Sequence, residues 1–228
     1  MRHHRAVARL LTMLPLVALL AGCGSTGESR SVQIAERPRW TAGDSWTYRG
    51  KGRDGAYTIT RRVLREGVFE GHDAYEVDAG DSRYWYTKRL GYLARITGGR
   101  TVRRAMPPED WQWPLQVGRS WSATVTWVDG PAQDRRFVLT GVWAVEAYEE
   151  VKTPAGTFKA FKVSRREIES GASQEFWYSA EVKGWVKVRG IDTAAGAYEE
   201  ELTAYSPRRP RMPPARLSTL DWPKDIGR

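Results

Sequence analysis

Residues 43–46 (GDSW), followed by Asp54-Gly55, recur as residues 118–121 (GRSW), followed by Asp129-Gly130. The offset between the two copies is 75 residues at each of these positions. Later segments match in the same order: 74–77 (AYEV) with 160–163 (AFKV), 85–87 (WYT) with 177–179 (WYS), and 91–93 (GYL) with 184–186 (GWV). Self-similarity in a fixed order indicates repetition of one structural unit. Two copies are too few for a solenoid, so we expect one domain whose halves share a core.

Alternation of apolar and polar residues predicts that both copies consist of β-strands. In residues 135–148, one face is expected to carry Phe137, Leu139, Trp143 and Val145, and the other Thr140 and Glu146. This alternation is typical of a half-buried antiparallel strand. The whole pattern predicts about eleven or twelve short strands and no convincing helix. We therefore expect an all-β fold, which is an antiparallel sandwich, a barrel or a curved, wrapped sheet built from two repeated modules.

Residues 1–22 have the features of an export signal. Arg2, Arg5 and Arg9 precede an apolar stretch at 10–20, which is shorter than the roughly 20 apolar residues that a membrane-spanning helix needs. The segment ends in Leu20-Ala21-Gly22-Cys23, which resembles a bacterial lipobox. The resemblance implies that Cys23 becomes the mature N-terminus and carries fatty acyl chains such as palmitate, which hold the protein on a lipid bilayer.

An ordinary secretory signal with an incidental cysteine is the alternative. Cys23 is the only cysteine of the chain and stands where a lipobox requires it, which favours lipidation. Residue 24 is Gly and not Asp. By analogy with the sorting of enteric lipoproteins, this predicts a location in the cell envelope on the outer membrane, facing the periplasm.

Composition changes along the chain predict how it is organised. A polar, small-residue stretch after Cys23 suggests a flexible tether, and a stretch rich in Pro and Arg near the C-terminus suggests an extended tail. We expect a signal peptide at 1–22, a tether at 23–37, a single β domain at 38–205 and a tail at 206–228. Within the β domain we expect modules at 38–106 and 113–205, joined by a linker at 107–112.

Residue counts argue against most catalytic and metal sites. The one cysteine is used for lipid, and His72 is the only histidine outside the signal peptide. A histidine-rich metal site is therefore impossible, and we expect no metal, no cofactor and no enzymatic activity. Asp44 with Glu109 or Asp110 could act as a glycosidase pair, but solvated turn carboxylates are far more common. Removal of the signal lowers the net charge from +9 to about +6. No nucleic-acid motif is present, so we expect no nucleic-acid partner.

Tryptophan is unusually frequent, with eleven in 228 residues. Four of them occupy repeated positions, where core anchoring is the simplest interpretation: Trp46, Trp85, Trp121 and Trp177. Trp185 differs, because simple alternation would put it on one strand face with Lys183, Lys187 and Arg189. An aromatic ring among outward-facing cations is a candidate contact for a lipid head group, a glycan or a partner, although packing beneath the tail is the alternative. Trp111 and Trp113, beside acidic residues in the linker, are further candidate contacts.

The second half carries a recognisable pattern: residues 153–158 (TPAGTF), 161–163 (FKV), 177–182 (WYSAEV) and 185–187 (WVK). It resembles the TapB-like exported β-proteins of bacteria, in which Ala180 is usually Pro. The resemblance implies an all-β periplasmic domain and brings no activity with it. By analogy of architecture alone, the curved sheet of the lipoprotein carriers LolA and LolB, which surrounds a greasy cavity, is a second comparison.

These observations favour a non-catalytic envelope lipoprotein that binds an apolar or amphipathic ligand, or an envelope partner. The alternative is a solid structural or assembly lipoprotein that docks another envelope protein or peptidoglycan. A tryptophan-lined cavity inside the β domain would distinguish the first hypothesis from the second.

Overall fold

The computed structural model describes residues 32–208, except 131, 133 and 193–195. The predicted signal peptide, Cys23, most of the tether and residues 209–228 of the tail lie outside the described residues. Within the described ranges no helix occurs, and so none that is long and apolar enough to cross a membrane. The predicted all-β class is confirmed.

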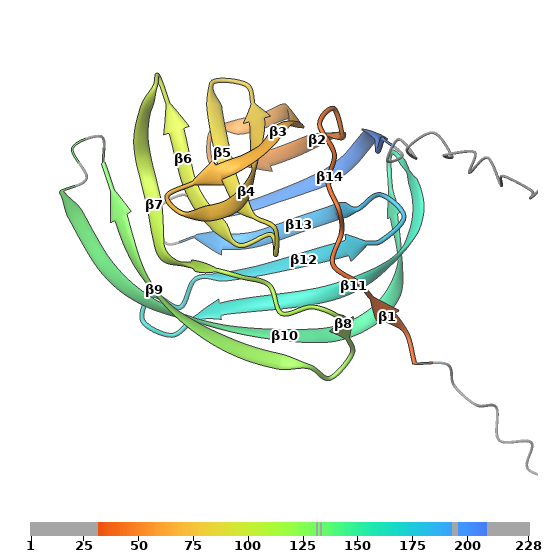
Figure 1. Cartoon of the computed structure of the whole chain (residues 1–228). Coiled ribbons are helices and arrows are strands. Elements are labelled where there is room, and N and C mark those ends of the chain that lie inside the picture. Colours follow the sequence, from red (N-terminus) through yellow and green to blue (C-terminus); the bar gives the residue numbers. More distant parts are fainter. Residues whose placement is uncertain (1–31, 131, 133, 193–195, 209–228) are drawn as a thin grey trace, which may run out of the picture. The chain divides into compact units, whose positions relative to one another are not determined.

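Twelve of the described strands form one closed antiparallel barrel (Figure 1). In the first half these are β2 (Ser45–Gly52), β3 (Gly55–Phe69), β4 (His72–Ala79), β5 (Ser82–Thr87), β6 (Tyr92–Thr97) and β7 (Arg100–Glu109). In the second half they are β9 (Ser120–Asp129), β10 (Arg135–Thr153), β11 (Gly156–Glu167), β12 (Ser173–Ser179), β13 (Gly184–Asp192) and β14 (Gly196–Ser206). Two further short strands, β1 (Ile34–Ala35) and β8 (Leu115–Gln116), pair with each other.

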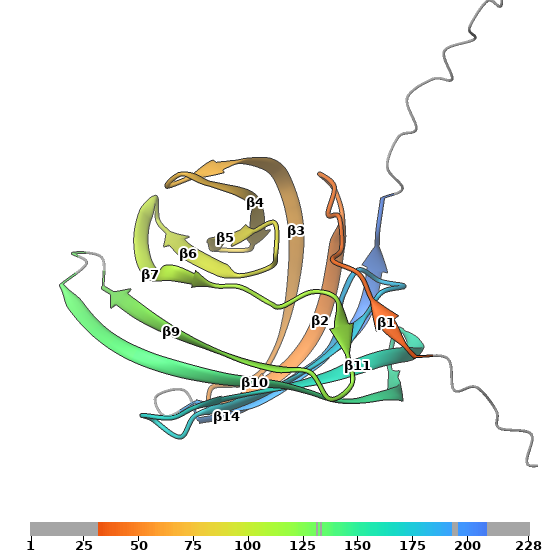
Figure 2. The ribbon, with the colours of Figure 1, turned by 60° about the horizontal axis from the view of Figure 1, so that its bottom comes forward.

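Each half is a six-stranded meander, and two seams join the halves. β14 pairs with β2 from Glu199 opposite Lys51 to Ser206 opposite Ser45. β7 pairs with β9 only from residue 103 to residue 106. Figure 2 shows the sheet curling from β3 round to β7 and on into β9. Closure removes free sheet edges, which would otherwise be sites of edge-to-edge association.

The two GxSW stretches make the same turn at the start of each half. Gly43 and Gly118 have φ values of +94° and +89°, which favour glycine. In the first half, the Gly43 N–H donates to the Val63 carbonyl at 2.8 Å, and the Val63 N–H donates to the Asp44 carbonyl at 2.9 Å. In the second half, the Gly118 N–H donates to the Val145 carbonyl at 2.9 Å, and the Val145 N–H donates to the Arg119 carbonyl at 2.8 Å. A β-bulge follows each valine, between residues 63 and 65 and between residues 145 and 147.

The strand at 135–148 faces as the sequence predicts, since Trp143 and Val145 are buried and Glu146 is exposed. The end of β7 differs from the sequence prediction, because residues 107–109 were placed in the linker. Pro107 and Pro108 lack an N–H to donate and resemble chain breakers. They fall where the β6–β7 pairing is interrupted, and Glu109 resumes it opposite Tyr92.

Candidate functional site

A cavity of about 220 Å³ lies inside the barrel and is lined mainly by aromatic side chains from both halves. Four tryptophans form much of its wall: Trp40, Trp46, Trp111 and Trp185. Tyr48, Tyr86, Phe176 and Tyr198 complete the aromatic lining. The hollow is therefore predominantly apolar, as expected of a ligand pocket with few, well-placed polar groups.

Two tryptophans of this cavity are held by hydrogen bonds to the backbone. Trp46 Nε1 donates to the Val182 carbonyl at 2.7 Å, and Trp40 Nε1 donates to the Lys183 carbonyl at 2.7 Å. The two rings lie 5.1 Å apart between centroids. Because both indole N–H groups are satisfied, the rings can present their apolar faces to the hollow.

Trp111 stands between this cavity and a second one. Its ring is 3% exposed and lies 5.4 Å from the rings of both Trp143 and Phe176, and 5.6 Å from that of Trp185. Trp113 stacks on it at 5.9 Å and donates from Nε1 to the Arg89 carbonyl. The predicted contact residues Trp111 and Trp113 thus lie in the interior and not on an exposed linker.

The second cavity has a volume of about 260 Å³ and a more polar wall. Trp111 and Leu90 line both cavities, so the two adjoin at these side chains. Leu90 has a φ of +64°. The polar lining of the second cavity comprises Arg95, Arg103, Glu109, Arg165, Glu167 and Gln174, and its aromatic lining comprises Tyr84, Tyr92, Trp127 and Trp143.

A buried ion pair forms part of this polar wall. Arg165 Nε lies 3.0 and 3.1 Å from the two carboxylate oxygens of Glu109, and Trp143 Nε1 donates to the same carboxylate at 3.0 Å. The arginine and glutamate side chains are only 5% and 6% exposed. Burial works against the charge of Arg165, but Glu109 and Glu167 outweigh it, so the pKa of Arg165 is raised. A Cβ at Gly141 would lie 2.2 Å from Glu109 Oε1, so glycine is what gives this carboxylate its space.

A second, partly buried ion pair lies at the wall of the aromatic cavity. Arg61 forms two hydrogen bonds to Glu200, at 2.7 and 3.0 Å, and Tyr57 Oη donates to the same carboxylate at 3.0 Å. Burial opposes the charge of Arg61, but Glu200 outweighs it and the pKa of Arg61 is raised. Each pair joins the two halves: Arg61 on β3 with Glu200 on β14, and Arg165 on β11 with Glu109 on β7.

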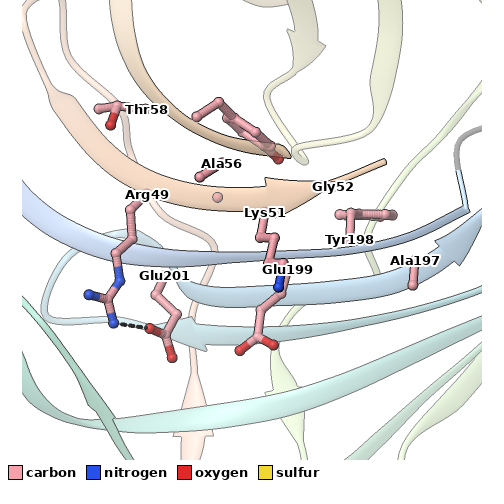
Figure 3. Close-up of a pocket in the computed structure, with 11 residues that line it drawn as sticks. Arg49, Lys51, Gly52, Ala56, Thr58, Ala197, Tyr198, Glu199 and Glu201 are labelled. Carbon is pink, nitrogen blue, oxygen red and sulfur yellow. Dashed lines mark hydrogen bonds and ion pairs between the residues drawn. The ribbon is translucent and has the colours of Figure 1, made fainter. Parts of the chain in front are cut away.

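A larger hollow, about 780 Å³, is an open surface depression at β2, β3 and β14 (Figure 3). Its charged groups, which Figure 3 shows on one side of the sheet, include a pair between Arg49 and Glu201 at 2.9 Å. The interior cavities are better candidates for a ligand site, because they exclude more water and converge on buried polar groups.

The predicted face of Trp185 is wrong. Trp185 lines the interior cavity, whereas Lys187 pairs with Glu199 and Glu201, and Arg189 pairs with Glu175. A β-bulge is the reason: Lys187 lies opposite Trp177 and Trp185 lies opposite Tyr178, so Val186 is an extra residue on β13. One extra residue moves the side chains that follow it on the strand to the opposite face of the sheet.

Lys183, the remaining predicted contact, lies in the tight turn before β13 with a φ of +57°. Its Nζ donates to the Arg208 carbonyl at 2.8 Å and lies 3.5 Å from Asp44 Oδ2. Asp44 Oδ1 accepts a hydrogen bond from the Arg208 N–H. Lys183 and the buried Asp44 therefore hold the last described residue of the chain.

Two of the repeated tryptophans, Trp177 and Trp85, lie on the outer face of the barrel, where charged side chains cover them. Phe176 and Tyr178 pack in the interior, so the intervening Trp177 faces outward. There it lies beneath three cations, with Arg189 at 5.3 Å, Lys162 at 5.8 Å and Lys187 at 5.9 Å from the ring centroid. Trp85 is covered in the same way by Arg65 at 5.2 Å.

No protein-family profile and no curated protein matches the chain. Solved structures resemble it, among them a protein described as exported, with a YmcC-like fold, from Bacteroides fragilis NCTC 9343 (15% identity, covering 75% of this chain and 99% of that chain, TM-score 0.44). Another is a protein described as a lipoprotein from Parabacteroides distasonis ATCC 8503 (15% identity, covering 76% of this chain and 100% of that chain, TM-score 0.35). A third is the hypothetical lipoprotein YmcC from Escherichia coli K12 (10% identity, covering 72% of this chain and 89% of that chain, TM-score 0.46). At these TM-scores the likeness is too loose to support an inference about this chain.

Proposed function

We propose that this protein is an envelope lipoprotein whose barrel binds the apolar part of an amphipathic ligand. The observation that carries the proposal is the aromatic cavity of about 220 Å³ inside the barrel. The N–H groups of Trp46 and Trp40 are bound to the backbone carbonyls of Val182 and Lys183, so burying an apolar chain against these two rings would leave neither N–H unsatisfied.

The size of the hollow supports a ligand larger than a few atoms. Together with the adjoining cavity of about 260 Å³, it reaches the range of roughly 300–1,000 Å³ that is typical of small-molecule sites. A packed core would leave few voids larger than a water molecule. Burial of apolar ligand surface there is favourable by roughly 25 cal/mol per Å².

The lipobox supports a location beside such ligands. Two or more acyl chains on Cys23 would give stable anchoring, whereas one chain gives only marginal binding. We propose that the anchor holds the barrel at the outer membrane, facing the periplasm, where amphipathic molecules are concentrated.

We also propose that the domain arose by duplication of a six-stranded unit. The matched hydrogen bonds of Gly43 and Gly118 support this, as do the bulges after Val63 and Val145. A cavity between two such units would draw its walls from both, as the lining of the aromatic cavity does.

Native mass spectrometry of the full chain purified from envelopes tests the binding role. We expect adducts with the mass of an amphiphile. Val188→Phe, which fills the cavity at a 7% exposed lining residue, should remove them. Val142→Phe, at a 43% exposed residue on β10, should leave them unchanged. If neither the unchanged protein nor Val142→Phe carried an adduct, the result would favour the docking role instead.

A further inference from the structure

Three polar groups on the wall of the second cavity make no hydrogen bond. Trp127 Nε1, Tyr92 Oη and Arg103 Nε are buried and make no hydrogen bond within the described residues, and all three side chains line the cavity. Burial raises the pKa of Tyr92, so its hydroxyl stays protonated and able to donate. Buried donors without acceptors are unusual in folded proteins, and each one calls for an explanation such as a bound ligand group.

The same wall carries three arginines, Arg95, Arg103 and Arg165, and they differ in whether a carboxylate faces them. Glu109 and Glu167 are both bound by Arg165. Arg103 Nε lies 3.4 Å from Asp129 Oδ1, which balances part of its charge without a hydrogen bond. Arg95 is exposed and pairs with no carboxylate in the described part of the chain. One guanidinium therefore remains available at the cavity.

The aromatic groups hold one of these cations in place. The Arg103 guanidinium lies over the Trp127 ring at 4.4 Å from its centroid, and Tyr92 packs against the same ring at 5.3 Å. A cation fixed on an aromatic face keeps its remaining N–H groups free for a planar or tetrahedral oxyanion.

We infer that the second cavity binds the oxyanion head, a carboxylate or a phosphate, of an amphiphile whose apolar chain lies in the aromatic cavity. Leu90 and Trp111, which line both cavities, mark where head and chain meet. The inference rests on the proposed function, because it assigns the head group of the same ligand.

Calorimetric titration of the full chain in phosphatidylcholine nanodiscs tests this, with protein-free nanodiscs as the blank. The probes are octyl phosphate, octanol and inorganic phosphate. We expect octyl phosphate to bind at least about tenfold more tightly than octanol, which is what one hydrogen bond to a charged group typically contributes. Trp127→Phe removes the indole N–H together with the five-membered ring that carries it, and should lower the affinity for octyl phosphate more than that for octanol. Arg95→Gln should do the same without risk to the fold, because Arg95 is exposed.

Arg100→Gln is the matched control, since Arg100 is an exposed arginine of the same hairpin that lines neither cavity. Equal affinities for octyl phosphate and octanol would overturn the inference and leave the proposed function standing. Failure of both octyl probes to bind would overturn both. If inorganic phosphate alone bound as tightly as octyl phosphate, the link between the two cavities would be refuted.

Discussion

Glu109→Ala should strongly destabilise the barrel. The change leaves Arg165, which is 5% exposed, without its main counter-ion, and leaves Trp143 Nε1 without an acceptor. Removing one partner of a buried pair typically costs about 3–5 kcal/mol, and here Arg165 stays buried with Glu167, at 2.7 Å, as its remaining counter-ion. For a domain of this size, about 2–4 °C per kcal/mol converts the loss to a fall in melting temperature of roughly 6–20 °C.

Circular dichroism during thermal unfolding measures this fall, and urea unfolding measures the free energy. Glu146→Ala is the control: it removes a 41% exposed partner of Lys162 from a 2.7 Å pair, and surface pairs contribute only about 0–1 kcal/mol. If both variants lost the same stability, our assignment of Glu109 as the buried counter-ion would be refuted.

A double variant distinguishes the stability lost with the ion pair from the stability lost with the side-chain volume. Glu109→Leu combined with Arg165→Met replaces both charges by apolar groups of similar length. Such replacements are often neutral or stabilising, so the double variant should unfold at a higher temperature than Glu109→Ala. A double variant that was no more stable than Glu109→Ala would show that packing at the site, and not the lost counter-ion, sets the cost.

Three further changes have defined outcomes. Gly141→Ala forces a Cβ to within 2.2 Å of Glu109 Oε1 and should cost about 1–3 kcal/mol in urea unfolding, whereas Gly52→Ala, with its nearest atom at 3.8 Å, should cost less. Burial, and then Glu200, raise the pKa of Tyr57 from 10.0 to about 12. The folded protein therefore holds the Tyr57 proton more tightly than the unfolded chain does. The free energy of unfolding that this proton contributes is complete below pH 10 and is lost as the pH rises toward 12. Urea unfolding across this range should show the loss, and Tyr57→Phe should reduce the slope. Cys23→Ser should abolish palmitate labelling and move the protein out of the membrane fraction; an unchanged fractionation would refute lipid anchoring.

The fold class was accessible from sequence because its evidence is local. Alternation in residues 135–148 and the turn glycines at 43 and 118 report on backbone geometry over a few residues. The face of Trp185 was not accessible, because a bulge depends on how β12 and β13 pair. A single sequence shows each strand but not its register.

The interior charges were missed for a similar reason. Arg61 and Glu200 are 139 residues apart, and each alone resembles an ordinary solvated residue of a strand. One local clue exists for the other pair: Gly141 occupies the inward face between Leu139 and Trp143, where a side chain is expected. A glycine on an apolar face indicates that another group approaches closely, and here that group is Glu109.

Closure of the sheet between β2 and β14 has a consequence for how the chain reaches its native state. Ser45 pairs with Ser206, so the barrel cannot close until β14 is available to pair with β2. Contacts between residues so distant slow folding, because the entropy of a long loop must be lost first. Until then β2 and β13 each present an unpaired edge to other chains. We therefore expect the newly made chain to depend on a holding chaperone during this interval, and to form inclusions when one is absent.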